Sequence, residues 1–369
     1  MSSRLGIASA AFCGFLAMTL STSAQAGDLS ATLKKGKPDI KSAGSLAFGP
    51  NGVLFVADTQ GGALFAFDTG DKVSKIRARG VEPIQVKDVA KAAADMLGTK
   101  AQGITINDVA VNPASGRAYL SITRGQGAEA LPAILSVGPD GKLRELSLDD
   151  AKFAKAVLPS PPKSTAKSQR ADAITDIAFI EGRVFVAGLS NEEFSSRLVA
   201  IPFPFEDISE GAGVEIYHGA HGRFETNSPV RTFVAYPMKD QTYLLAAYTC
   251  TPLVKIPISD LKPGARVKGK TIAELGNRNR PIDMIVYKKG GKDFLLMANS
   301  SRGVMKIPTE GADTADSITS RVADKKGMPY ETIAALKDVT QLDKLDSGHA
   351  LILFRSAAGT LDLETIELP

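Results

Sequence analysis

The chain of 369 residues is 44% hydrophobic and 23% charged, and its 44 Lys and Arg against 40 Asp and Glu give a formal net charge of +4. This composition excludes a disordered chain, and the near balance of charge argues against nucleic acid as the partner. Two Cys and three His also exclude a disulfide scaffold, a haem attached through two Cys and a His, and zinc-finger spacing.

Residues 1–26 are a predicted signal peptide. Arg4 is their only charge, residues 5–20 are mostly apolar, and Ala24 and Ala26 offer a small-residue cleavage site. The apolar run is short for a membrane span, and no later run reaches that length. We therefore expect cleavage after Ala26 and a periplasmic or secreted protein in which Cys250 is the remaining thiol.

Short apolar runs separated by Gly, Pro, Asn and Asp then recur six times, and each unit begins with three predicted strands. The first strands are expected at residues 45–48, 108–111, 176–179, 232–235, 283–286 and 341–345. The second strands are expected at 53–57, 117–121, 183–187, 242–246, 294–298 and 350–354. The third strands are expected at 63–67, 133–137, 197–201, 253–256, 304–307 and 360–363. Weaker fourth strands are expected at 75–79, 143–146, 214–217, 271–275 and 317–321.

Six such units predict an all-β fold, a six-bladed β-propeller of four-stranded antiparallel blades that forms a single domain over residues 27–369. The last unit lacks a fourth strand, so we expect residues 29–40 to pair near 360–368 and close the ring. Apolar residues at helical spacing predict one inserted helix within 85–98, which Gly98 ends. Residues 159–171, rich in Pro, Ser and basic residues, are expected to form a mobile surface loop.

Most of the chemically rich residues fall on one face, in the loops that join second to third strands and one blade to the next. Guanidinium groups there could bind an anionic ligand. This predicted ligand-binding set, which would serve an anionic small molecule or another exported protein, comprises Arg231, Arg278, Arg280, Asn299, Arg302 and Arg355. The alternative is structural, because arginines at these positions could instead pair with Asp108, Asp176 and Asp283 between blades.

A second candidate site on that face is metal-binding. His218 and His221 share a loop with Glu225, and Cys250 enters the same face one connection later. Imidazole and thiolate groups suit copper or zinc. We expect Cys250 to be reduced and within about 10 Å of His218, since a wider separation would exclude a shared ion. The alternative is that the loop residues only hydrogen bond to one another.

Residues 48–58, with the sequence Phe-Gly-Pro-Asn-Gly-Val-Leu-Phe-Val-Ala-Asp, resemble blades of the NHL-repeat and SMP-30/gluconolactonase-like six-bladed propellers. The resemblance implies one divalent cation, often calcium, held in the central channel by a Glu, an Asn and an Asp. Asn107, Asp108 and Asp283 match such positions loosely. The first inner strand opens with Ala43, Gly44 and Ser45, where the family places its Glu.

Two functions follow from these observations. The first is an exported propeller that binds a ligand or protein on the face with the long loops, without catalysis. The alternative is a metal-dependent hydrolase of the lactonase type with a cation in the central channel. The sequence contains no Gly-x-Ser-x-Gly, phosphate-loop or His-Glu-x-x-His motif that would specify another reaction.

Overall fold

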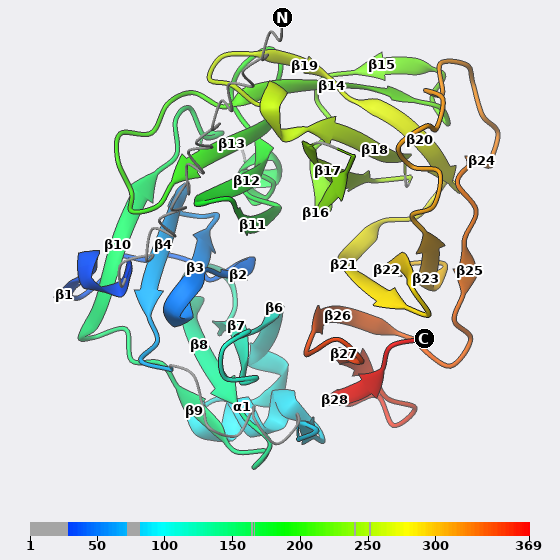
Figure 1. Ribbon diagram of the computed structural model, residues 1–369. Coiled ribbons are helices and arrows are strands. Elements are labelled where there is room, and N and C mark those ends of the chain that lie inside the picture. The colour runs from blue at the N-terminus through cyan, green and yellow to red at the C-terminus, as the bar shows by residue number, and fades with distance from the viewer. Residues whose placement is uncertain (1–28, 72–81, 164, 166, 240, 251) are drawn as a thin grey trace, which may run out of the picture.

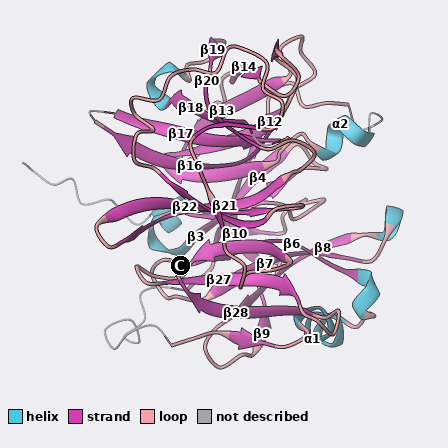
Figure 2. Ribbon diagram, turned by 90° about the vertical axis from the view of Figure 1, so that its right-hand side faces the viewer, coloured by secondary structure: helices cyan, strands magenta, loops and turns pink. Residues whose placement is uncertain are grey.

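The computed structural model describes residues 29–369 except 72–81, 164, 166, 240 and 251. Its strands form six sheets arranged around a common centre (Figure 1), so the six-bladed propeller prediction is confirmed. The predicted signal peptide and the strand predicted at 75–79 lie outside the described residues. Figure 2 shows that the described chain is mostly strand, with the short helices at the margin of the ring.

We number the blades by the order of their inner strands along the chain. Blade 1 consists of β2 (Leu46–Phe48), β3 (Val53–Asp58), β4 (Ala63–Asp68), β10 (Ala151–Val157) and β1 (Lys34–Gly36). Blade 2 consists of β6 (Ile104–Val111), β7 (Ala118–Arg124), β8 (Leu131–Val137) and β9 (Leu143–Glu145). Blade 3 consists of β11 (Asp176–Ile180), β12 (Arg183–Leu189), β13 (Ser196–Pro202), β14 (Ala212–His218) and β15 (Arg223–Glu225), with β19 (Arg266–Lys268) parallel to β14.

The other three blades follow the same antiparallel plan. Blade 4 consists of β16 (Val230–Met238), β17 (Gln241–Tyr248), β18 (Pro252–Pro257), β20 (Lys270–Leu275) and β24 (Lys325–Gly327). Blade 5 consists of β21 (Pro281–Lys289), β22 (Lys292–Asn299), β23 (Gly303–Pro308) and β25 (Glu331–Thr332). Blade 6 consists of β26 (Val339–Lys344), β27 (His349–Arg355), β28 (Leu361–Glu367) and β5 (Gln85–Val86).

The blades do not follow one another around the ring in chain order. The inner strand β2 contacts both β11 and β6, and β6 contacts β26. Blade 2 therefore lies between blades 1 and 6, and the order around the ring is 2, 1, 3, 4, 5, 6 (Figure 1). On its way out to blade 2 the chain supplies β5 to the outer edge of blade 6, and on its way back it supplies β10 to the outer edge of blade 1.

This order makes the predicted closure wrong. The outer strand of blade 6 is β5, with Val86 opposite Leu363, whereas β1 pairs with β10 in blade 1. The fourth strand predicted at 317–321 is also wrong, because those residues are not a strand and β25 takes that place in blade 5. Backbone pairing at an outer edge requires little of the side chains, so the apolar pattern does not show which segment supplies it.

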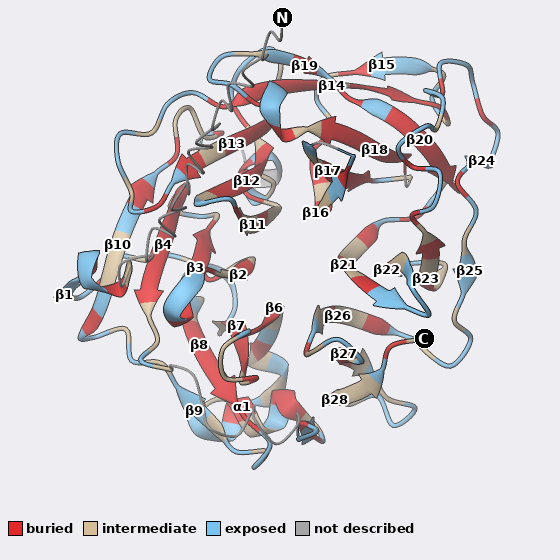
Figure 3. Cartoon of the chain, viewed as in Figure 1, coloured by how far each residue is buried: buried red, intermediate tan, exposed pale blue. Residues whose placement is uncertain are grey.

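The middle strands are buried on both faces, since each blade packs against two neighbours. All six residues of β3 are buried, whereas exposed residues concentrate in the outer strands and loops (Figure 3). A strand covered on both sides has a continuous apolar sequence without alternation, which is why these runs were recognisable.

The inserted helix prediction is confirmed as α1 (Val89–Leu97). Asp88 caps its first turn by accepting a hydrogen bond from the Lys91 N–H, and Gly98 ends it with a φ of 67°. The helix packs between blades 2 and 6, with Leu97 in a core shared with Leu351. The short 3₁₀ helices are η1 (Leu29–Thr32), η2 (Pro50–Gly52), η4 (Ala101–Gly103), η5 (Gly127–Glu129) and η6 (Ile258–Asp260).

The segment predicted as a mobile loop is anchored to blade 1. It contains the short helix α2 (Lys167–Ala171), and the buried Arg170 side chain donates hydrogen bonds to the Pro162 and Gln60 carbonyl oxygens at 2.7 and 2.8 Å. A mobile loop is therefore the wrong description of the Arg170 end.

Candidate metal site

The site is built on the hairpin that joins β14 to β15 in blade 3. His218 is the last residue of β14 and lies opposite Arg223 in the ladder. The turn between them closes through a hydrogen bond of 2.8 Å from the Gly222 N–H to the His218 carbonyl, with Gly222 in the left-handed region at a φ of 69°. This turn folds the His221 ring over the His218 ring, and the ring centroids lie 3.9 Å apart.

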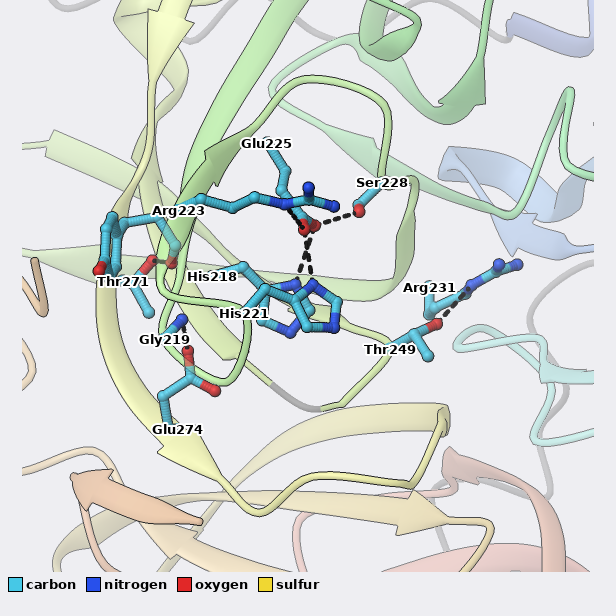
Figure 4. Close-up of polar contacts among 11 residues, drawn as sticks. His218, Gly219, His221, Arg223, Glu225, Ser228, Arg231, Thr249, Thr271 and Glu274 are labelled. Atoms are coloured by element: carbon cyan, nitrogen blue, oxygen red, sulfur yellow. Dashed lines mark hydrogen bonds and ion pairs between the residues drawn. The ribbon is translucent and has the colours of Figure 1, made fainter. Parts of the chain in front are cut away.

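A single carboxylate holds both imidazoles (Figure 4). His218 Nδ1 lies 2.9 Å from Glu225 Oε2, and His221 Nδ1 lies 2.6 Å from Glu225 Oε1. Ser228 Oγ donates to Oε2 at 2.7 Å, and Arg223 Nε donates to Oε1 at 3.2 Å. Four side chains therefore converge on Glu225, whose own side chain is 4% exposed.

The electrostatics assign the proton on each ring. Burial alone would raise the pKa of Glu225, but the hydrogen bonds from Ser228, His218 and His221 outweigh it and lower this pKa to about 2. An ionised carboxylate only accepts, so each Nδ1 carries the hydrogen and each Nε2 of a neutral ring presents a lone pair. Burial lowers the pKa of His218 and favours its neutral form.

His218 Nε2 has no hydrogen-bond partner among the described residues, although the side chain is only 3% exposed. Buried polar atoms are normally satisfied, because leaving one unpaired costs about 1–3 kcal/mol. The His221 side chain, in contrast, is 45% exposed. The pair therefore has one ring fixed inside the protein and one at its surface.

Cys250 completes the cluster from the turn between β17 and β18. The His218, His221 and Cys250 ligand atoms all lie within 4.8 Å of one another, so the expected proximity is confirmed. The Cys250 N–H donates to the Asn279 carbonyl at 2.8 Å, and Cys250 has a φ of 61°, a left-handed conformation that is costly for a residue with a side chain. The thiol is free.

A further group, the buried Glu274 on β20, lies beneath the histidine turn and was not foreseen. Its Oε1 accepts a hydrogen bond of 2.5 Å from the Gly219 N–H (Figure 4). Burial raises the pKa of Glu274 to about 7. The available signal was a carboxylate inside an otherwise apolar strand, where five of six residues are buried.

The predicted anion-binding set is only partly gathered on this face. Arg231 on β16 pairs with Asp172 at 2.5 and 3.3 Å and donates to Thr249, next to Cys250. Arg278 and Arg280 are exposed on the loop that contacts the Cys250 N–H.

The other three members of that set have local partners. Arg302 pairs with Asp324 at 3.0 Å, and the Arg302 backbone N–H donates to Asn299. Arg355 belongs to blade 6 and donates to the Gly359 carbonyl. Their arrangement therefore does not define one ligand site.

The inner-strand aspartates do not pair with these arginines, so the predicted Arg–Asp pairing is wrong. Each aspartate accepts one backbone N–H from its own strand and one from the neighbouring blade, at 2.6–2.8 Å. Asp108 joins blade 2 to blade 1, and Asp176 joins blade 3 to blade 4. Asp283 joins blade 5 to blade 6, and Asp343 joins blade 6 to blade 2.

These aspartates line a central cavity of about 420 Å³. Burial raises the pKa of Asp176 to about 7 and of Asp343 to about 6, and it raises those of Asp108 and Asp283 well above the ordinary value. Asn107, the remaining member of the channel-cation prediction, donates its amide hydrogens to the Ala43 carbonyl and Thr123 Oγ1.

No protein-family model and no curated protein matches the chain. Among solved structures, it is similar to a putative oxidoreductase (glucose dehydrogenase) from Thermus thermophilus, at 11% identity over 90% of this chain and 100% of that one, with a TM-score of 0.36. It is similar to a PQQ-bound aldose sugar dehydrogenase from Streptomyces coelicolor, at 12% identity over 90% and 95% of the chains, with a TM-score of 0.31.

A third similar structure is an engineered GH43 glycoside hydrolase with endo-xylanase and exo-arabinofuranosidase activity, at 11% identity over 72% of this chain and 51% of that one, with a TM-score of 0.35. Nothing about the activity of this chain follows from these similarities. Within the described residues, no helix is long and apolar enough to span a membrane.

Proposed function

We propose that this protein is an exported binding protein that takes up a soft transition-metal ion, of the zinc or copper type, at His218, His221 and Cys250. The observation that carries the proposal is the buried His218 Nε2, which lacks a partner in the described chain while its Nδ1 is held by Glu225. Export rests on the predicted signal peptide.

The second contact of each imidazole supports metal binding over simple loop bracing. A metal-ligating histidine typically donates its other ring N–H to a carboxylate, which fixes the ring and its tautomer. Here one carboxylate does this for two histidines. Hydrogen bonds that only shaped the hairpin would have no need to leave the buried His218 Nε2 without a partner among the described residues.

The donor set has the chemistry of a three-ligand site. Two imidazoles and one thiolate suit zinc and copper, at bond lengths of about 2.0–2.3 Å, which place neighbouring ligand atoms roughly 3.5 Å apart in a tetrahedron. The ligand atoms lie within 4.8 Å of one another, so at most a modest contraction would bring all three to one ion. Three protein ligands leave a fourth position for a small ligand, which is where an anionic partner would bind.

Cobalt titration of the metal-free mature protein tests the proposal. We expect one Co²⁺ per chain with a sulfur-to-cobalt charge-transfer band, lost in Cys250→Ser and His218→Gln. His349→Gln is the matched control, since His349 binds Asp346 in blade 6, away from the site. A charge-transfer band that persists in Cys250→Ser, or no binding by the wild type, would contradict the proposal.

A lactonase-type hydrolase is the second candidate, because Asp108 and Asp283 line the central cavity. It has weaker support, since both carboxylate oxygens of each aspartate already accept backbone N–H groups. Activity against a panel of lactones that requires Ca²⁺ and is abolished by Asp283→Asn would favour it.

A further inference from the structure

Glu274 is a buried carboxylate beside the proposed metal site. The residue is 2% exposed, and its Oε1 accepts a hydrogen bond from the Gly219 N–H. In the described part of the chain, no Lys, Arg or His lies within 4.0 Å of it as an ion-pair partner. A buried carboxylate without a cation is costly, so the position invites a positive charge.

The fold holds this carboxylate close to the histidine turn. A Cβ at Gly219 would lie 2.8 Å from Glu274 Oε1, so only glycine lets the turn and the carboxylate approach this closely. The Val322 N–H donates to the Gly219 carbonyl at 2.9 Å and secures the turn from the other side. In Figure 4 the Glu274 side chain is directed at Gly219, beneath the paired imidazoles.

The carboxylate does not belong to the group of ligand atoms within 4.8 Å of one another. Glu274 is therefore not a ligand in this group, and from its contact with Gly219, next to His218, it would act on a bound ion through its charge. A charge near a partly buried ion acts through a medium of lower effective dielectric than water, and this effect scales with the charge of the ion.

The charges around the site can be counted. At pH 8, above the pKa of about 7 to which burial raises Glu274, the negative groups with a metal bound are the Cys250 thiolate, Glu225 and Glu274. Arg223 is the cation in contact with Glu225, and its side chain is 72% exposed. Arg278 and Arg280 are further cations, on the loop that contacts the Cys250 N–H. Whatever the net charge of the site, the charge of Glu274 acts on a divalent ion about twice as strongly as on a monovalent ion at the same position.

We propose that Glu274 makes this site selective for a divalent ion of the zinc type over Cu⁺. The inference rests on the proposed function, because it names which of the two ions that suit the donor set the site prefers. Removing the charge of Glu274 should weaken Zn²⁺ binding more than Cu⁺ binding, by about tenfold or more in the ratio of the two affinities.

Competition titrations against chromophoric chelators, under anaerobic reducing conditions at pH 8, measure the Zn²⁺ and Cu⁺ affinities separately. The ratio should shift toward Cu⁺ in Glu274→Gln and stay near the wild-type value in Glu274→Asp, which keeps the charge. Glu145→Gln, an exposed strand glutamate of blade 2, is the matched control. Thermal unfolding of each variant checks that it is folded.

If Glu274→Gln does not fold, Gly219→Ala provides a second test, since its added methyl displaces the carboxylate without removing it. A smaller shift in the same direction is expected, because the charge is moved away from the site and is not removed. Wild-type protein that binds neither ion overturns the proposed function itself. Wild-type protein that binds both ions, with an unchanged ratio in Glu274→Gln or Gly219→Ala, overturns this inference alone and leaves Glu274 as a structural group.

Discussion

The inner-strand aspartates and Glu225 are both enclosed carboxylates, but their partners differ. Asp108, Asp176, Asp283 and Asp343 accept backbone N–H groups from two adjacent blades, whereas Glu225 accepts hydrogen bonds from side chains. A backbone N–H that donates to a carboxylate has no second polar atom with which to bind a ligand. An imidazole bound through Nδ1 presents Nε2 beyond it, so the carboxylate orients a group that can bind something else.

The pKa shifts separate the two regions in the same way. Burial raises the pKa values of the channel aspartates, whereas for Glu225 the hydrogen bonds from Ser228, His218 and His221 together outweigh burial and lower its pKa to about 2. The partners of a buried carboxylate therefore indicate its role better than its burial does. By this criterion the aspartates join neighbouring blades, and Glu225 orients His218 and His221 for the proposed metal site.

The largest expected effect is on stability, from Asp283→Ala. The substitution leaves the Met284 and Leu342 N–H groups without their acceptor at the junction of blades 5 and 6. We expect the free energy of unfolding to fall by about 2–5 kcal/mol, with metal affinity unchanged. Urea unfolding measures it, with Asp149→Ala, an exposed residue, as the control. A loss of metal binding in folded Asp283→Ala would contradict the distinction between aspartates that join blades and a glutamate that serves the metal site.

The two regions should also respond to pH with opposite signs. For Asp176 and Asp343 the folded pKa is raised to about 7 and about 6, so their stabilising contribution is complete below about pH 4 and is lost as the pH rises toward 7. For Glu225 the contribution is present above about pH 4.5 and is lost as the pH falls toward 2.

Urea unfolding from pH 3 to pH 8 tests these signs. In Asp176→Asn/Asp343→Asn, the decline in unfolding free energy between pH 4 and pH 7 should be smaller than in the wild type. In Glu225→Gln, the decline on acidification below pH 4.5 should be smaller. If unfolding free energy depends on pH in the same way in the wild type and both variants, the pKa values of these carboxylates are not shifted in opposite directions.

Glu225→Gln should affect metal binding more than it affects the fold. A glutamine keeps one acceptor oxygen but cannot accept from both imidazoles as the carboxylate does, so one ring loses its fixed tautomer. We expect Zn²⁺ affinity to fall about 10–100-fold, as for other carboxylates behind ligating histidines. Zinc competition titration measures the affinity. An unchanged affinity would show that Glu225 only stabilises the hairpin.

The smallest effect is expected at the arginines. Arg231 forms a partly buried pair with Asp172, so Arg231→Ala should cost about 1–2 kcal/mol. Arg278 is exposed, and Arg278→Ala should stay within about 0.5 kcal/mol of the wild type. Thermal unfolding compares the two, and equal losses would show that the Asp172 pair contributes nothing specific.

Local features of this protein were determined by the sequence alone. Inner strands, the turns between them and α1 depend on neighbours in the chain, so apolar runs and Gly98 predicted them. His218, His221 and Glu225 also lie within eight residues, and the hairpin that brings them together is local. Cys250 was within reach of the same reasoning, because strand connectivity places both loops on one face.

Only the tertiary structure decided the order of the blades, the strands β5 and β10 that complete blades 6 and 1, and the position of Glu274. Each depends on hydrogen bonds in which at least one partner is a backbone group, and the backbone is the same in every residue. The Glu274 carboxylate meets the Gly219 N–H across 55 positions of sequence. Such contacts arise from how six sheets pack around one axis, so the apolar strand sequence around Glu274 indicates that the carboxylate is buried but does not indicate which backbone group it meets.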